Sequence, residues 1–485
     1  MNKQIDVLSR TFVHPNLTFV EGHSEKNHSL DDFYNAISYW KIVLYEGYNL
    51  RPGNKICIYD STVGFLYTSL FFAAAELGLE IVSPPEKAVD TSGYVDKMEI
   101  IVEGRGLPDV GFIDDINLND VAVTAMCKRY SKVVANQKIF FDYLIKDHQL
   151  YDEISTAIFA NPNDILVTTT TSGSTGVPKI VSYTHKQLYR LAIRNAELLD
   201  FKDQPICHTR NMHHAFVLFC HLLSTFYATP THYSFPLVRN ETELAFVNFI
   251  KEKKISRLAL SYKGLLDSML LTMVSNNIKF EHDVDIIVGG FHVSAEYIDA
   301  VKKTNVKNIK SIFGSNEAFG PIFVKITNQE SDVDTYRSDW FPPTPDNFMK
   351  IDSVGDKISV TVESLDVYNV LLDDTLVGDN ISGYVHKGRD NLFRINEIDF
   401  KIHELNSLIS PYCTGEFDVC ADLANQKLHL AIWSGDVDFT KVNQAMALKY
   451  KELLFDDYAK LDKNKFSGFK VEMALVRNYF RNLKK

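Results

Sequence analysis

The spacing of hydrophobic residues predicts a chain that alternates between strands and helices. Residues 30–44 carry large apolar side chains three or four positions apart, which is typical of a helix with one buried face. A short apolar strand over 55–59, an apolar helix ending at Gly78 and a second strand over 81–85 follow. A strand, a helix and a strand in this order predict a βαβ unit and a parallel sheet.

The same patterns continue along the rest of the chain. Further buried strands are expected at 165–167, 180–183, 284–288 and 310–313, and helices at 186–199 and 213–228. After residue 350 the pattern changes to short alternating strands, at 357–362 and 384–386. The C-terminal part predicts a helix at 403–410, a hairpin at 417–433 and a helix at 440–459.

Composition places the chain among soluble globular proteins. Its 485 residues are 45% hydrophobic and 23% charged, and this length predicts two or more domains. The net charge of −11 argues against non-specific nucleic-acid binding. Residues 1–6 lack an apolar signal core, and the apolar run 70–75 is too short to span a bilayer, so no membrane partner is expected. Without a CxxC pair, the cysteines fit reduced thiols in the cytoplasm: Cys57, Cys127, Cys207, Cys220, Cys413 and Cys420.

Residues 168–179 form a dense run of hydroxyl side chains and glycines that ends in Pro178-Lys179. Glycines let the backbone approach a ligand closely, and successive N–H groups can surround an anion. The spacing does not match a Walker loop, which opens a helix. Strands are expected on both sides, so the run reads as a loop that binds polyphosphate, with a polar surface turn as the alternative.

Together with Thr184-His185, this run resembles the phosphate loop of the adenylate-forming enzymes, which include acyl-CoA synthetases, aryl-acid ligases, luciferases and peptide synthetase adenylation domains. The resemblance implies activation of a carboxylate by ATP to an acyl-AMP, with release of pyrophosphate. It also implies that the nucleotide is bound by residues of this loop, namely Thr171, Ser172, Gly173, Ser174, Thr175, Gly176 and Lys179.

The resemblance implies the overall fold as well. An α/β chain is expected, with a large N-terminal AMP-binding domain at 1–388, built of stacked αβ subdomains plus a distorted β-barrel. A small, mobile α+β domain is expected at 389–485, with Asp390 as the hinge between the two.

A second segment, Phe313-Gly314-Ser315-Asn316-Glu317, is similar to the family pattern Tyr-Gly-x-Thr-Glu. The resemblance implies that Phe313 and Gly314 contact adenine and that Asn316 lies near the α-phosphate. Glu317 is expected to hold Mg²⁺, which prefers a carboxylate together with phosphate oxygens and water. A solvated glutamate at the start of a helix is the alternative.

Two shorter sequence segments are similar to the ribose-binding and hinge motifs of the family. Val377-Gly378-Asp379 resembles Thr-Gly-Asp, whose carboxylate accepts both ribose hydroxyls, as an acceptor-only group can. Gly388-Arg389-Asp390 resembles the Gly-Arg-x-Asp hinge but is one residue shorter, and Arg389 is expected to contact the ribose.

The expected acyl pocket combines two segments. His214 and Phe216 match a family step that begins the pocket helix, and His214 is also expected to act in catalysis. Gly289, Gly290 and Phe291 match a turn that lies between adenine and the acyl chain. No aspartate stands where amino-acid activators bind an ammonium group, which favours an apolar or aryl acid. A structural histidine and an ordinary strand-end turn are the alternatives.

The C-terminal catalytic lysine is the largest departure from the family. The family ends in Ser/Asn-Gly-Lys, whereas Ser467-Gly468 is followed here by Phe469 and then Lys470. Lys470 is the expected catalytic lysine; Lys463 or Lys465 are alternatives, as is loss of the role.

The expected activity is therefore that of an AMP-forming acid–thiol ligase. It would use ATP, Mg²⁺ and a small carboxylic acid, and would pass the acyl group to CoA or a separate carrier protein. A ligase with an amine, hydroxyl or protein acceptor is one alternative, and a catalytically silent nucleotide- or acyl-binding protein is another.

Overall fold

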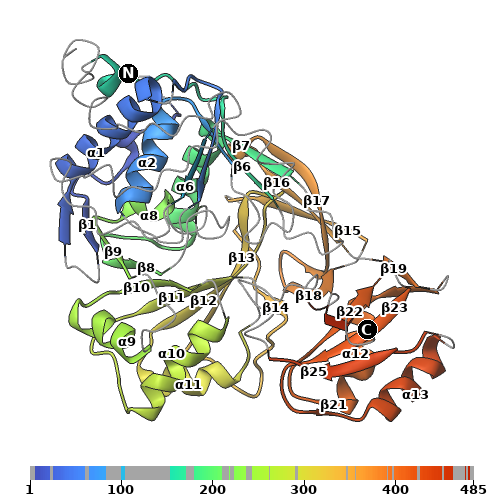
Figure 1. Ribbon diagram of the computed structural model, residues 1–485. Helices are drawn as coiled ribbons and strands as arrows, with labels where there is room; N and C mark the ends of the chain where they lie inside the picture. Colours follow the sequence, from blue (N-terminus) through green and yellow to red (C-terminus); the bar gives the residue numbers. More distant parts are fainter. Residues whose placement is uncertain are drawn as a thin grey trace.

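The computed structural model shows a mixed α/β chain with several sheets (Figure 1). It describes residues 6–21, 26–47, 49–59, 65–82, 100–103, 153–170, 180–209, 218, 223–235, 243–260, 263–289, 293–345, 348–355, 357–389, 392–395, 398–422, 426–450, 453–462, 476 and 479–480. No helix among these residues is long and apolar enough to cross a membrane.

The N-terminal sheet has five strands in the order β5-β3-β4-β6-β7. The predicted βαβ unit is confirmed, because β3 (Lys55–Tyr59) and β4 (Glu80–Val82) are parallel and α2 (Phe65–Glu76) connects them. The remaining strands are β5 (Ile100–Glu103), β6 (Ile165–Thr170) and β7 (Ile180–Thr184). Strands β6 and β7 pair antiparallel, so the predicted strands on either side of the phosphate-loop sequence are also confirmed.

The second sheet has eight strands in the order β13-β12-β11-β10-β8-β9-β1-β2. Its strands are β1 (Thr18–Glu21), β2 (Lys26–Ser29), β8 (Ile206–His208), β9 (Thr231–Ser234), β10 (Arg257–Leu260), β11 (Asp285–Gly289), β12 (Asn308–Ser315) and β13 (Gly320–Asn328). Six neighbouring strands, β12, β11, β10, β8, β9 and β1, run parallel, and β13 returns antiparallel beside β12. The carboxyl ends of the six parallel strands therefore share one edge of the sheet.

Helices cover both sheets. They are α1 (Leu30–Ile42), α6 (His185–Leu198), α8 (Leu223–Ala228), α9 (Glu243–Glu252), α10 (Lys263–Ser275) and α11 (Glu296–Thr304). The side chains of Ser29 and Asp32 form a capping box that starts α1, and Thr184 and Gln187 do the same for α6. Of the helix expected at 213–228, the described part is α8.

A third, antiparallel sheet has the order β14-β18-β17-β16-β15. Its strands are β14 (Trp340–Phe341), β15 (Lys350–Val354), β16 (Lys357–Val362), β17 (Val367–Asp379) and β18 (Gly383–Arg389). This sheet lies in the part of the sequence where the distorted β-barrel is expected. Bulges interrupt the pairing of β17 with both of its neighbours, and no pairing among the described residues closes the sheet.

The C-terminal elements are β19 (Leu392–Ile395), β20 (Ile398–Lys401), α12 (Ile402–Ile409), β21 (Cys413–Thr414), β22 (Phe417–Asp422), β23 (Lys427–Ile432), β24 (Asp436–Val437), α13 (Phe439–Tyr450) and β25 (Asp457–Lys460). They pack around a core of their own that includes Leu405, Leu430 and Met446. The predicted hairpin at 417–433 is confirmed.

The helix expected over 440–459 is wrong in its second half. Helix α13 ends at Tyr450, and 457–460 form β25, which pairs parallel with β23. The amide side chain of Asn443 exchanges hydrogen bonds of 2.9 and 3.2 Å with the backbone of Phe455, which turns the chain back. Burial of Leu453 and Phe455 then outweighs continuation of the helix.

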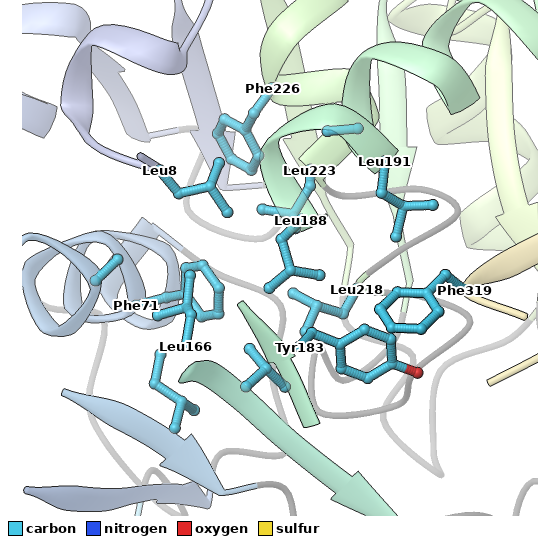
Figure 2. Packing of buried hydrophobic residues seen from close by; sticks show 14 of the residues in the cluster. Leu8, Phe71, Leu166, Tyr183, Leu188, Leu191, Leu218, Leu223, Phe226 and Phe319 are labelled. Atoms are coloured by element: carbon cyan, nitrogen blue, oxygen red, sulfur yellow. The ribbon is translucent and has the colours of Figure 1, made fainter. Parts of the chain in front are cut away.

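The largest core joins elements that lie far apart in the sequence (Figure 2). Leu8 from the N-terminal segment, Phe71 from α2, Leu188 from α6 and Phe226 from α8 meet in it. Phe319, from the turn after β12, reaches the same cluster and lies beside Tyr183 of β7. This core therefore fixes the phosphate-loop hairpin relative to the second sheet.

A buried ionic cluster stabilises the N-terminal part. The carboxylate of Glu76 accepts hydrogen bonds from the Arg10 guanidinium at 2.7–3.2 Å and from Lys41 Nζ at 2.9 Å. The side chains of Glu76 and Lys41 are fully buried. Burial alone would raise the pKa of Glu76, but the hydrogen bonds and charges of Arg10 and Lys41 hold that pKa below its usual value.

We expect Glu76→Gln to lower the free energy of unfolding by about 3–5 kcal/mol, because it leaves two cations without their buried counter-charge. Urea unfolding monitored by circular dichroism measures the loss. Glu363→Gln is the matched control, since Glu363 pairs with Lys350 on the surface, where solvent screens the interaction. Equal losses in both variants would contradict this account of the cluster.

Candidate active site

The turn between β12 and β13 is built so that the two strands almost touch. A Cβ at Gly314 would lie 2.5 Å from the carbonyl oxygen of Gly320, so a side chain there cannot be accommodated without a shift. The pairing has a bulge at this point. Phe319 and Gly320 both have positive φ, of 60° and 104°, and the first is unusual for a bulky residue. The sequence Phe313–Glu317 therefore occupies a tightly constrained position.

Phe313 leaves part of its ring exposed while the rest is fixed by neighbours. Its ring centroid lies 5.9 Å from that of Phe323, 5.6 Å from that of Phe341 and 5.0 Å from that of His386. The imidazole of His386 is in turn within 2.9 Å of the Asp374 carboxylate. A half-buried, well-supported ring of this kind suits a flat ligand.

The carboxylate of Glu317 is oriented by its own turn. The hydroxyl of Ser315 donates a 2.6 Å hydrogen bond to Glu317 Oε2 and accepts one of 3.2 Å from the Glu317 backbone N–H. No group of three or more metal-ligating side chains gathers among the described residues. A single half-buried carboxylate fits Mg²⁺ that takes its other ligands from phosphate and water.

Tyr183 connects this turn to the phosphate-loop hairpin. It lies four residues after Lys179 and is fully buried. Its hydroxyl donates a 3.0 Å hydrogen bond to the carbonyl oxygen of Asn316, and its ring meets that of Phe319 edge to face at 4.7 Å. The strand that follows the glycine-rich sequence is thus in direct contact with the turn that carries Asn316 and Glu317.

The base of the hairpin is cross-linked below the loop. Thr168 of β6 and Ser182 of β7 stand opposite each other, and their hydroxyl oxygens are 2.8 Å apart. The Thr168 hydroxyl also donates a 2.7 Å hydrogen bond to Glu80 on β4. These contacts fix the direction in which the two strands enter and leave the loop.

Asp379 ends β17 at an exposed turn. Its Oδ1 accepts hydrogen bonds from the N–H groups of Ser382 and Ile381 and from the Ser382 hydroxyl, at 2.6–2.9 Å. These bonds, led by the Ser382 N–H, hold the pKa of the carboxyl below its usual value. Among the described residues no hydrogen bond reaches Oδ2, and this oxygen has the acceptor capacity expected for ribose hydroxyls.

Other candidate residues are positioned by the strands that carry them. Gly289 ends β11 and pairs with Ile312, one residue before Phe313, so the expected acyl-pocket turn begins at the same sheet edge as the Asn316–Glu317 turn. Arg389 ends β18 opposite Asp374. Ligands of open α/β sheets bind at the carboxyl ends of the parallel strands.

Several expected site residues lie outside the described residues. They are the whole loop Thr171, Ser172, Gly173, Ser174, Thr175, Gly176 and Lys179, the pocket residues His214, Phe216, Gly290 and Phe291, the hinge Asp390, and Lys470 with its alternatives Lys463 and Lys465. Their roles stay predictions.

The sequence patterns did not indicate Tyr183, Ser315 or His386 as site residues. For Tyr183 a signal was available, because alternation along β7 places Val181 and Tyr183 on one face, and a buried tyrosine needs a partner for its hydroxyl. The contact of His386 depends on the bulge in the β17–β18 pairing, which no local pattern predicts.

Comparison with known proteins assigns the family. Residues 114–358, just over half of the chain, match the sequence profile described as AMP-binding enzyme. The chain belongs to the AMP-binding enzyme family. This confirms the resemblance to the adenylate-forming enzymes. No curated protein sequence matches the chain significantly.

Several solved structures have a fold similar to that of this AMP-binding family member, over almost the whole length of both chains. ATP-bound MatB from Rhodopseudomonas palustris has 13% identity and a TM-score of 0.65, and covers 99% of this chain and 100% of its own. A fatty acyl CoA synthetase of Mycobacterium tuberculosis has 14% identity and a TM-score of 0.64, with coverage of 97% and 96%. The anthranilate CoA ligase AuaEII, in complex with anthranoyl-AMP, has 15% identity and a TM-score of 0.63, with coverage of 96% and 94%. These likenesses show a shared fold.

His185, directly after the Thr184 helix cap, is fully buried, and neither ring nitrogen has a partner among the described residues. Burial lowers its pKa to about 4, although the charge of Asp164 opposes the shift. The ring is therefore neutral near pH 7.

We expect the stability of this AMP-binding family member to fall as the pH drops from about 6.5 to about 4. The unfolded chain binds a proton at His185 in this window and the folded chain does not, which costs about 3 kcal/mol. In His185→Gln this part of the pH dependence should vanish. Urea unfolding of both proteins at pH 7 and pH 4.5 measures it, and an identical pH dependence in the variant would show that His185 does not contribute.

Proposed function

We propose that this chain activates a carboxylic acid with ATP to an acyl-adenylate, releases pyrophosphate, and transfers the acyl group to a thiol. The observation that carries the proposal is the contact between Tyr183 and Asn316. It places the return strand of the hydroxyl- and glycine-rich loop directly on the turn that presents Phe313, Asn316 and Glu317. A triphosphate and an adenine ring that are parts of one ligand need these two segments side by side.

In this proposal each part of the site has one task. Phe313 and Gly314 contact the adenine, Asn316 the α-phosphate region, and Asp379 and Arg389 the ribose. Lys179 and the loop 171–176 hold the β- and γ-phosphates. Glu317 holds Mg²⁺, which neutralises phosphate charge when it is bound.

The reaction is a displacement at phosphorus. A carboxylate oxygen of the substrate forms a bond to the α-phosphorus, and the bond from that phosphorus to the bridging β-oxygen breaks, so that pyrophosphate leaves with the electron pair. The side chains contribute position and charge neutralisation. Lys470 is proposed to stabilise the charge on the reacting carboxylate and α-phosphate.

For the second step we propose a rotation of residues 389–485 relative to 1–388 about Asp390, which presents the adenylate to CoA or to a separate carrier protein. The substrate is proposed to be an apolar or aryl acid without an α-amino group, bound among His214, Phe216, Gly289 and Phe291, with Gly290 on the nucleotide side of the same turn. The proposed substrate class rests on the sequence of these segments, which lacks an aspartate where amino-acid activators bind an ammonium group.

ATP–pyrophosphate exchange with a panel of aryl, fatty and amino acids tests the proposal. We expect exchange with at least one aryl or fatty acid, and Lys179→Ala should reduce it by about 10²–10³-fold, because it removes a charge from the transferring phosphates. Lys186→Ala is the matched control, since Lys186 pairs with Asp366 outside the site, and it should exchange like the wild type.

If ATP–pyrophosphate exchange occurs with α-amino acids only, the proposed substrate class is contradicted. No pyrophosphate exchange with any acid, with the protein folded, would instead favour the catalytically silent nucleotide- or acyl-binding alternative. The departures from the family pattern at Phe313, Asn316 and Phe469 point to that alternative.

A further inference from the structure

We propose that Tyr183 is a positioning residue that sets the geometry of the Mg²⁺-binding turn from the phosphate-loop hairpin. The inference deepens the proposed function and rests on it, because it assigns Glu317 to the metal. It follows from three contacts that meet at the Asn316 carbonyl and the Phe319 ring.

The Asn316 carbonyl oxygen accepts two hydrogen bonds. One comes from the Phe319 N–H at 3.1 Å and closes the turn, and the other comes from the Tyr183 hydroxyl at 3.0 Å. A carbonyl oxygen has two lone pairs, so both are occupied by this arrangement. The hydroxyl therefore fixes the peptide plane between Asn316 and Glu317 from outside the turn.

The turn itself stores backbone strain at Phe319. Its φ of 60° is costly for a bulky residue, and such conformations persist only where the surroundings impose them. The Tyr183 ring lies edge-on against Phe319, at 81° between planes, and Phe319 is nine-tenths buried in the same core. Tyr183 thus supports the strained residue with its ring and the turn's carbonyl with its hydroxyl.

The chain direction gives this contact its significance. Glu317 directly follows Asn316, and the Ser315 hydroxyl holds its carboxylate against the same turn. A rotation of the peptide between Asn316 and Glu317 would move the Glu317 carboxylate relative to β7. The proposed phosphate loop ends only four residues before Tyr183 in the sequence. The phenol of Tyr183 therefore connects the turn that carries Glu317 to β7, the strand that follows the proposed phosphate loop.

Tyr183→Phe is the direct test, because it removes one oxygen and retains the ring. Tyr297→Phe is the matched control: Tyr297 is a buried tyrosine whose hydroxyl donates to Asp267, and the two residues lie on α11 and α10. We expect Tyr183→Phe to raise the Mg²⁺ concentration for half-maximal pyrophosphate exchange by about three- to tenfold, the effect of one lost hydrogen bond. Tyr297→Phe should leave this concentration unchanged.

A second readout needs no catalysis. Amide hydrogen exchange over 316–320 should be about three- to tenfold faster in Tyr183→Phe than in the wild type or in Tyr297→Phe. Calorimetric titration of Mg·ATP should show a parallel loss of affinity. If Tyr183→Phe leaves amide hydrogen exchange over 316–320 unchanged, or leaves the Mg²⁺ requirement of pyrophosphate exchange unchanged, the inference is overturned.

The outcomes separate the inference from the proposed function. A wild-type chain that binds Mg·ATP but exchanges no pyrophosphate overturns the function alone, and the titration and amide exchange still decide the role of Tyr183. A wild-type chain that binds no Mg·ATP overturns both.

Discussion

The turn between β12 and β13 is the constraint on which the site depends. Its two strands approach so closely that a Cβ at Gly314 would lie 2.5 Å from the carbonyl oxygen of Gly320, and Phe319 and Gly320 both have positive φ. Such a turn needs support from elsewhere in the fold, and the Tyr183 hydroxyl and ring provide it from the neighbouring sheet. The same contact joins strand β7, which follows the proposed phosphate loop in the sequence, to the turn that carries the Glu317 carboxylate.

The surrounding layers keep that contact in place. Tyr183 and Phe319 belong to the largest core, which also contains Leu188 of α6 and Phe71 of α2 (Figure 2). The buried Glu76 cluster fastens α1, α2 and the N-terminal segment on the far side of the same core. Protein interiors are close-packed, so a displacement in this core is passed on to neighbouring side chains, including Tyr183 and Phe319 at the turn after β12.

The local parts of this architecture were predictable from the sequence, and the long-range parts were not. The β6–β7 hairpin, the βαβ unit and α1 follow from alternation and helical spacing, because each depends on neighbouring residues. The helix expected over 440–459 was wrong because Asn443 and the buried Leu453 and Phe455 redirect the chain. The motif Phe313–Glu317 was recognisable, but its support was not, since Tyr183 and Asn316 are 133 residues apart. The support of Phe313 by His386 likewise depends on a bulge in a sheet rather than on a pattern.

The central claim is that the turn after β12 and the loop after β6 bind one nucleotide. A crystal structure of the protein with ATP and Mg²⁺ tests it most directly. The account predicts adenine against Phe313, the ribose within hydrogen-bond distance of Asp379, and Mg²⁺ bound to Glu317 between the turn and the β- and γ-phosphates. A nucleotide bound away from the carboxyl ends of β11 and β12, or a metal that does not contact Glu317, would contradict it.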